Sequence, residues 1–130
     1  MITVAAGILK QHGRILICQR KSTGAFPLQW EFPGGKVEAG EDARSCLRRE
    51  LREELAIEAD IGPEVSAFQY TYPNGFQVDL VFFQVHGYAG EMVNQAFEQI
   101  IWEDAPKLVT YDFLEGDRAL VARLARGELL

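Results

Sequence analysis

Residues 34–57 read GGKVEAGEDARSCLRRELREELAI, two glycines followed by a charged segment with a regular apolar pattern. From Asp42 onward, apolar side chains recur at steps of three and four residues, which is the spacing of one face of an α-helix. We therefore expect a helix from Asp42 to Leu55, with the Asp42 side chain capping its start. The apolar face consists of Ala43, Cys46, Leu47, Leu51 and Leu55.

The same segment places three carboxylates together. Glu50, Glu53 and Glu54 stand at positions i, i+3 and i+4, so a helix brings them to one patch. Like charges at this spacing destabilise a helix by about 0.2–0.5 kcal/mol per pair, so a compensating positive charge is expected. Two interpretations are open: a solvated face of salt bridges, or a hard divalent cation held by carboxylate oxygens. The arginines available for the first are Arg44, Arg48, Arg49 and Arg52.

The residues before the helix favour the second interpretation. Residues 32–36 (FPGGK) contain two glycines, which let a backbone approach an anion or a metal ion closely. Lys36 can offset phosphate charge, and Glu41 falls between this loop and the helix, where it can orient a catalytic group. Alone, the glycines indicate only a turn. The carboxylates that follow make residues 32–54 a candidate site.

The spacing of residues 35–57 resembles the Nudix box, the signature of the Nudix hydrolases. That signature is Gly-x5-Glu-x7-Arg-Glu-aliphatic-x-Glu-Glu-x-Gly-aliphatic, and every fixed position matches except the last glycine, which is Ala56 here. The family's glycine ends the helix, where a left-handed conformation is convenient, and an alanine that keeps this conformation costs on the order of 1 kcal/mol. The carboxylates precede Ala56, so the departure concerns the helix end and not the chemistry. The matching residues are Gly35, Glu41, Arg49, Glu50, Leu51, Glu53, Glu54 and Ile57.

The remaining sequence reads as strands and one further helix. The order strands, helix, strands, helix predicts an α/β or α+β fold with a mixed sheet between helices. The resemblance implies the same architecture, an α/β/α sandwich formed by a single domain over residues 1–130. The expected strands are 3–9, 14–19, 30–32, 65–72, 76–85 and 100–102, and the expected second helix is 119–124.

The resemblance also implies a reaction and a cofactor. Water attacks a phosphorus of a nucleoside diphosphate linkage with the assistance of Mg²⁺ or Mn²⁺. By similarity, Glu53 and Glu54 are expected to be metal ligands together with the Gly34 carbonyl. Glu50 is expected to be a ligand or the general base.

Three further residues are expected to support these glutamates. Glu41 falls where it can assist catalysis, and Arg49 is expected to orient a glutamate through a bidentate pair. Many family members draw another metal-binding glutamate from the loop before a late strand, and Glu98 is the candidate here. Its register differs from the usual one, so an exposed glutamate is the alternative interpretation.

Substrate contacts are expected mostly outside the box. Residues 30–38 (WEFPGGKVE) resemble the MutT branch of the family, which acts on nucleoside triphosphates. Arg20 and Lys36 match phosphate-contacting positions of that branch, with ordinary surface charges as the alternative. Asp117 falls where an Asn or Asp often reads the base edge, although it can also cap the last helix. Trp30 and Phe32 are expected to line a base pocket or, alternatively, to pack in the core.

The resemblance therefore predicts hydrolysis of a nucleoside triphosphate to the monophosphate and pyrophosphate, with 8-oxo-dGTP as the first substrate to test. A CTP-like nucleotide and a non-catalytic nucleotide sensor are the alternatives. The net charge of −6 argues against a nucleic-acid polymer or an anionic membrane as partner. Without a membrane-spanning run or a signal peptide, and with Cys18 and Cys46 expected to be buried thiols, a cytoplasmic monomer or homodimer is expected.

Overall fold

The computed structural model describes residues 2–130 and is built around a seven-stranded mixed sheet. The strand order is β3-β2-β1-β6-β5, with β4 paired to β1 and β7 paired to β2. Among the strand pairs that residues 2–130 form, only β1–β6 is parallel, and it runs from Ile2 opposite Val78 to Leu9 opposite Val85. The strands are β1 (Ile2–Gln11), β2 (Arg14–Gln19), β3 (Trp30–Glu31), β4 (Gly34–Lys36), β5 (Glu58–Thr71), β6 (Gln77–Ala89) and β7 (Gln99–Asp104).

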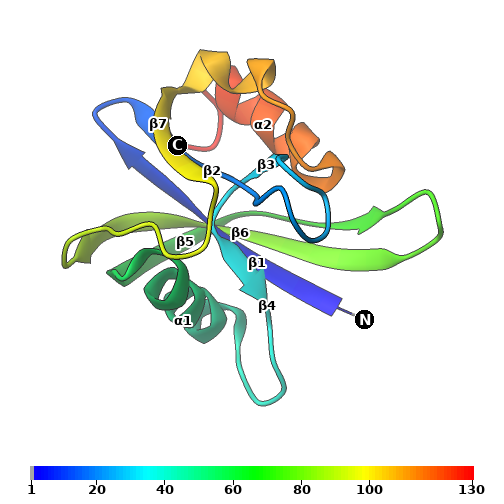
Figure 1. Ribbon diagram of the computed structural model, residues 1–130, viewed down its shortest axis with the longest axis horizontal. Helices are drawn as coiled ribbons and strands as arrows, with labels where there is room; N and C mark the ends of the chain where they lie inside the picture. Colours follow the sequence, from blue (N-terminus) through cyan, green and yellow to red (C-terminus); the bar gives the residue numbers. More distant parts are fainter. Residues whose placement is uncertain (1) are drawn as a thin grey trace.

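Helices cover both faces of the sheet, as Figure 1 shows. Helix α1 (Ala43–Leu55) lies on one side, and α2 (Arg118–Ala125) lies on the other with the 3₁₀ turns η1 (Ala105–Thr110) and η2 (Glu115–Asp117). The predicted α/β sandwich with a mixed sheet is therefore confirmed. No helix within residues 2–130 is both long enough and apolar enough to cross a membrane.

Two apolar cores separate the layers, and alternate residues of β1 point into each. Ala5 and Leu9 pack in the core under α1, whereas Ala6 and Ile8 pack in the core under α2. The α1 core contains the predicted helix face, of which Cys46, Leu47, Leu51 and Leu55 are fully buried. Cys18 is buried in the same core, as expected.

Both ends of α1 follow from local chemistry. The Asp42 Oδ1 atom accepts a hydrogen bond from the Ser45 backbone N–H at 2.8 Å, so the predicted cap is confirmed. At the other end Ala56 takes φ 60° and ψ 30°, and its N–H donates to the Arg52 carbonyl at 3.0 Å. The left-handed helix end is thus kept although alanine occupies it, at a cost of about 1 kcal/mol.

Several strands run a few residues past their predicted ends, and β5 and β4 differ more. Strand β5 begins at Glu58 rather than at residue 65, because bulges between Asp60 and Ser66 disrupt the alternation that marks a strand. Strand β4 was not predicted, since glycines carry no strand pattern. It forms because Gly34 fits against β1: a Cβ on Gly34 would lie 2.0 Å from the Ala5 carbonyl oxygen.

Candidate active site

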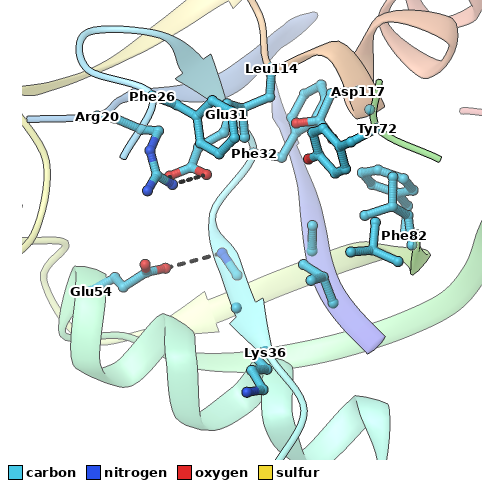
Figure 2. A pocket seen from close by; sticks show the side chains of 17 residues that line it. Arg20, Phe26, Glu31, Phe32, Lys36, Glu54, Tyr72, Phe82, Leu114 and Asp117 are labelled. Atoms are coloured by element: carbon cyan, nitrogen blue, oxygen red, sulfur yellow. Dashed lines mark hydrogen bonds and ion pairs between the residues drawn. The ribbon is translucent and has the colours of Figure 1, made fainter. Parts of the chain in front are cut away.

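A cavity of about 270 Å³ opens where β4, the loop after β2, the β5–β6 hairpin and η2 meet. Figure 2 shows charged side chains entering it from separate elements, with Arg20 and Glu31 near one another and Asp117 beside Tyr72. Its apolar wall includes Phe32, Val78, Leu80 and Phe82. The charged residues that line it are Arg20, Glu31, Lys36, Glu54 and Asp117.

Glu54 in the last turn of α1 reaches across to β4. Its carboxylate accepts a hydrogen bond from the Gly34 backbone N–H at 3.0 Å (Figure 2). Burial, followed by the negative charges of Glu31 and Glu50, raises the pKa of Glu54 to about 9. Within residues 2–130, no arginine or lysine forms an ion pair with this carboxylate. The Glu54 carboxyl therefore keeps its proton at neutral pH, and a bound cation would stabilise its ionised form.

Gly35 lets a second glutamate approach the same strand. A Cβ at this position would lie 2.4 Å from the carboxyl carbon of Glu50, so any side chain here would displace that group. Burial raises the pKa of Glu50, while hydrogen bonding to Arg49 opposes that change. The two adjacent glycines thus have different structural roles. Gly34 allows β4 to pair closely with β1, and Gly35 leaves space for the Glu50 carboxylate.

Arg49 connects three of the expected site glutamates. Its Nε and Nη2 atoms donate to the two carboxylate oxygens of Glu41 at 2.8 and 2.9 Å, which is a bidentate pair. Its Nη1 atom lies 2.9 Å from Glu50 and 3.3 Å from Glu53. Hydrogen bonding to Arg49 lowers the pKa of Glu41 to about 2. The expected bidentate arginine is present, and its partner is Glu41.

The other arginines do not neutralise the carboxylate patch. Arg44 donates to the carbonyls of Ile61 and Gly62, and Arg52 forms an ion pair with Glu58 at 2.6 Å. Of the four arginines of α1, only Arg49 therefore forms ion pairs within the carboxylate patch. Among residues 2–130, Glu54 has no positively charged partner.

The donor set fits a hard divalent ion, although the glutamates are not gathered around one point. Within residues 2–130, no three His, Cys, Asp or Glu side chains converge closely enough to hold a metal ion. Arg49 holds Glu50 and Glu53, and the Gly34 N–H holds Glu54. Carboxylate oxygens and a backbone carbonyl are nevertheless what Mg²⁺ and Mn²⁺ prefer. The residues that would hold the ion are Glu50, Glu53, Glu54 and the Gly34 carbonyl.

The structure does not bring Glu98 to this site. Its neighbour Phe97 is buried, and alternation along the chain leaves Glu98 exposed, with its N–H donating to the Gln19 carbonyl. A smaller hollow beside the Arg20–Glu31 pair is lined by Glu54, Ala96 and Phe97. The alternative interpretation of Glu98, an exposed glutamate, is the one that the structure supports.

Asp117 lies at the opposite end of the cavity from α1. It is 8% exposed, and its side chain makes no capping hydrogen bond to α2, so the capping interpretation is wrong. Burial and the charge of Glu31 raise the pKa of Asp117 to about 7, although a hydrogen bond from the Phe32 backbone N–H acts to lower it. The buried carboxyl faces the cavity beside Tyr72.

The two expected base-pocket aromatics have different surroundings. Phe32 lines the cavity and packs edge-on against Phe82 at a centroid distance of 6.2 Å. Trp30 does not line it, because its ring packs in the α2 core against Tyr111 at 5.0 Å. Of the two interpretations of Trp30, the structure supports the core aromatic.

Among the lining residues that were not predicted as site candidates are two polar ones, Glu31 and Tyr72. Glu31 accepts hydrogen bonds from Arg20 Nη1 at 3.0 and 3.2 Å, and it lies close enough to Glu54 and Asp117 to raise both pKa values. The sequence feature that could have indicated Glu31 is its position as a charged residue between two aromatic residues in a short strand. Tyr72 ends the strand before a hairpin turn, and that turn accounts for the local sequence by itself.

Comparisons with known proteins agree with this geometry. The CTP pyrophosphohydrolase of Escherichia coli K12 is 35% identical over 121 residues, covering 93% of this chain and 89% of that protein. The 8-oxo-dGTP diphosphatase of Haemophilus influenzae is 34% identical over 125 residues, covering 95% and 91%. The solution structure of the E. coli ORF135 protein superposes with a TM-score of 0.83 at 34% identity, covering 94% of this chain and 86% of that one.

The family profile described as NUDIX domain matches residues 1–124, which includes every glutamate of the α1 patch. A MutT structure from work on Aliivibrio salmonicida and Vibrio cholerae aligns over 97% of this chain and 98% of its own, with a TM-score of 0.77 and 29% identity. On its sequence, its fold and the arrangement of its carboxylates, this chain belongs to the Nudix hydrolase family.

Proposed function

We propose that this protein hydrolyses a nucleoside triphosphate to the nucleoside monophosphate and pyrophosphate, with Mg²⁺ as cofactor and Mn²⁺ as a substitute. The observation that carries the proposal is the partly buried Glu54 carboxyl, which has no cationic partner among residues 2–130 and lines a cavity whose far end holds Asp117. One end of the cavity suits a metal-bound polyphosphate and the other end suits a base edge.

Each part of the site has a role in this reaction. Magnesium, when bound, neutralises phosphate oxygens and lowers the pKa of the attacking water. Glu53 and Glu54 would hold the ion with the Gly34 carbonyl, and Glu50 would join them or accept the proton of the attacking water. Arg20 and Lys36, both on the cavity wall, bind phosphate oxygens.

Arg49 and Glu41 keep the glutamates oriented, because the bidentate pair fixes the guanidinium that contacts Glu50. Their contribution is therefore to geometry rather than to bond making.

The base is read by Asp117. An ionised carboxylate can accept hydrogen bonds from guanine N1–H and N2–H₂ together, or from the amino group of cytosine. The names of the H. influenzae and E. coli relatives support 8-oxo-dGTP as the first substrate and CTP as the second. The intact set of carboxylates argues against a sensor that binds a nucleotide without hydrolysing it. With a net charge of −6, the protein is expected to act on free nucleotides in the cytoplasm rather than on a polymer or membrane.

The test is release of pyrophosphate from a panel of nucleotides, with and without Mg²⁺. Glu53→Gln should abolish turnover while circular dichroism shows an intact fold, and Glu98→Gln should retain wild-type turnover as the matched control. Asp117→Ala should raise KM for the preferred base more than for the others. Wild-type rates in Glu53→Gln, or release of orthophosphate instead of pyrophosphate, would refute the proposal.

A further inference from the structure

A second hollow of about 500 Å³ adjoins the cavity, and we call it the aromatic groove. Phe26, Tyr72 and Val78 line both the cavity and the groove, so the two hollows lie next to one another. Figure 2 shows Phe26 and Tyr72 above the cavity. The remaining lining residues of the groove are Pro73, Asn74, Phe76 and Glu115.

The groove adjoins the base end of the cavity and not the metal end. Glu115 lines the groove, and Asp117, two residues further along η2, lines the cavity. Neither Glu54 nor Gly34 lines the groove. A molecule bound with its phosphates near α1 would therefore enter the groove only through a group attached to its base.

The groove is lined by aromatic rings rather than by cationic side chains. The Tyr72 ring centroid lies 6.1 Å from that of Phe26 and 6.2 Å from that of Phe76. Phe26 and Phe76 remain 46% and 47% exposed, which is unusual for phenylalanine in a folded domain. No Lys, Arg or His is among the described residues that line it. Its polar groups are engaged, since Asn74 Oδ1 accepts from the Phe76 N–H and Glu115 is hydrogen-bonded to the Tyr70 hydroxyl.

The backbone holds Phe26 at this edge in an unfavourable conformation. Phe26 has φ +51° and Leu28 has φ +62°, values that bulky residues rarely adopt. Arg20 stabilises the loop, because its Nε atom donates to the Ala25 carbonyl at 3.0 Å and its guanidinium lies 5.9 Å from the centre of the Phe26 ring. Strained residues of this kind cluster at ligand-binding sites.

We infer that the aromatic groove is a subsite for an apolar or aromatic substituent on the nucleobase, so that the substrates include nucleoside triphosphates alkylated or arylated on the exocyclic amino group. This inference rests on the proposed function and specifies its substrate class. The triphosphate end supplies the reacting bond, and the groove supplies selectivity through stacking with Phe26, Tyr72 and Phe76.

The experiment compares matched pairs of substrates. The pairs are dATP with N6-benzyl-dATP, dCTP with N4-benzyl-dCTP, and dGTP with N2-benzyl-dGTP. For the base that is hydrolysed best, we expect the benzylated nucleotide to have a kcat/KM at least equal to that of its plain partner. Phe76→Ala should lower kcat/KM for the benzylated nucleotide by roughly three- to tenfold and leave the plain one unchanged. Phe76 is suited to this test because it lines the groove and not the cavity.

Two further variants keep the result interpretable. Phe76→Trp preserves a ring face and should retain the benzylated substrate, which separates stacking from a disturbed hairpin. Val109→Ala removes an exposed apolar side chain outside both hollows and should affect neither substrate.

The outcomes distinguish the inference from the function on which it rests. Hydrolysis of the plain nucleotides with rejection of all benzylated ones overturns the inference alone. Equal losses of kcat/KM for both members of a pair in Phe76→Ala also overturn the inference. So does a change of oligomeric state in that variant without a change of selectivity, because the groove would then be a contact between copies of the chain. If no nucleotide is hydrolysed, the proposed function fails, and the inference fails with it.

Discussion

The guanidinium of Arg49 holds Glu41 through both carboxylate oxygens and at the same time donates to Glu50, which lies against the backbone of Gly35. Two of its three nitrogens are therefore committed to a group outside the carboxylate patch, and the third contacts the patch. This division fixes the direction of the guanidinium before any ligand arrives.

Arg49→Lys should lower kcat without unfolding the protein. An ammonium group cannot contact both Glu41 oxygens and Glu50 in fixed geometry, so Glu50 loses its orientation. We expect a loss of roughly ten- to hundredfold in kcat, as is typical when a residue that supports a metal ligand is replaced. Steady-state kinetics at saturating Mg²⁺ measure this. Arg48→Lys, on the exposed side of α1, is the control and should retain wild-type kcat.

Glu54→Gln should reduce the stabilisation of the protein by magnesium. A ligand that binds only the folded state raises the melting temperature, and at a given ligand concentration the rise grows with the logarithm of its affinity for that state. We expect the affinity for Mg²⁺ to fall by at least roughly tenfold in this variant. Thermal melts over a Mg²⁺ titration would show a smaller shift than in the wild type, whereas Glu98→Gln should shift like the wild type. The same Mg²⁺ response in Glu54→Gln and the wild type would exclude Glu54 as a ligand.

Ala56→Gly should stabilise the protein and leave its activity unchanged. The left-handed conformation at this position costs alanine about 1 kcal/mol and costs glycine almost nothing, so the free energy of unfolding should rise by about that amount. Urea denaturation measures the change. Ala119→Gly, at an exposed position inside α2, should instead destabilise the protein by roughly 0.5–1 kcal/mol. A loss of stability in Ala56→Gly would show that the helix end is not left-handed.

Asp117 should make the stability depend on pH. Its pKa is about 7 in the folded protein and 3.8 ordinarily, so between those values the folded protein keeps a proton that the unfolded chain has released. The stability that comes from the protonated carboxyl is fully present at pH about 4 and is lost as the pH rises to about 7. Asp117→Asn cannot titrate there.

The measurement for Asp117 is the free energy of unfolding of the wild type minus that of Asp117→Asn, determined by urea denaturation in EDTA. The difference should fall as the pH rises from about 4 to about 7 and then become constant. A difference that stays constant over this whole range would mean that the carboxyl ionises as freely when folded as when unfolded.

What the sequence predicted, and what it did not, depends on how local the determinants are. The apolar period of α1, its Asp42 cap and its Arg49–Glu50 contact all lie within a few helical turns. Residue spacing alone was therefore sufficient to predict this helix and its carboxylate patch. Glu31 enters the cavity because β3 pairs with β2, and Tyr72 enters because a hairpin packs beside η2. These placements need partners far away in the sequence, and no short pattern reports them.

The exposed position of Glu98, one of the two interpretations of this residue, has the same origin. A glutamate near the start of a late strand fits the family pattern in type, but which side it faces is fixed by Phe97, which is buried under α1. One step along an extended chain reverses the direction of a side chain, so an error of one residue in register moves a carboxylate from the site to solvent.

The parallel pairing of β1 with β6 has a consequence for how the site assembles. Val4 and Ala6 form part of the cavity wall, yet β1 hydrogen-bonds along its length to residues 78–85. A growing chain that has reached residue 70 already contains the glycines and every α1 glutamate, but it lacks the strand that holds β1 in place. Because contacts between residues so distant in the sequence form slowly, the glutamates of α1 are synthesised early, but the cavity wall beside them forms late.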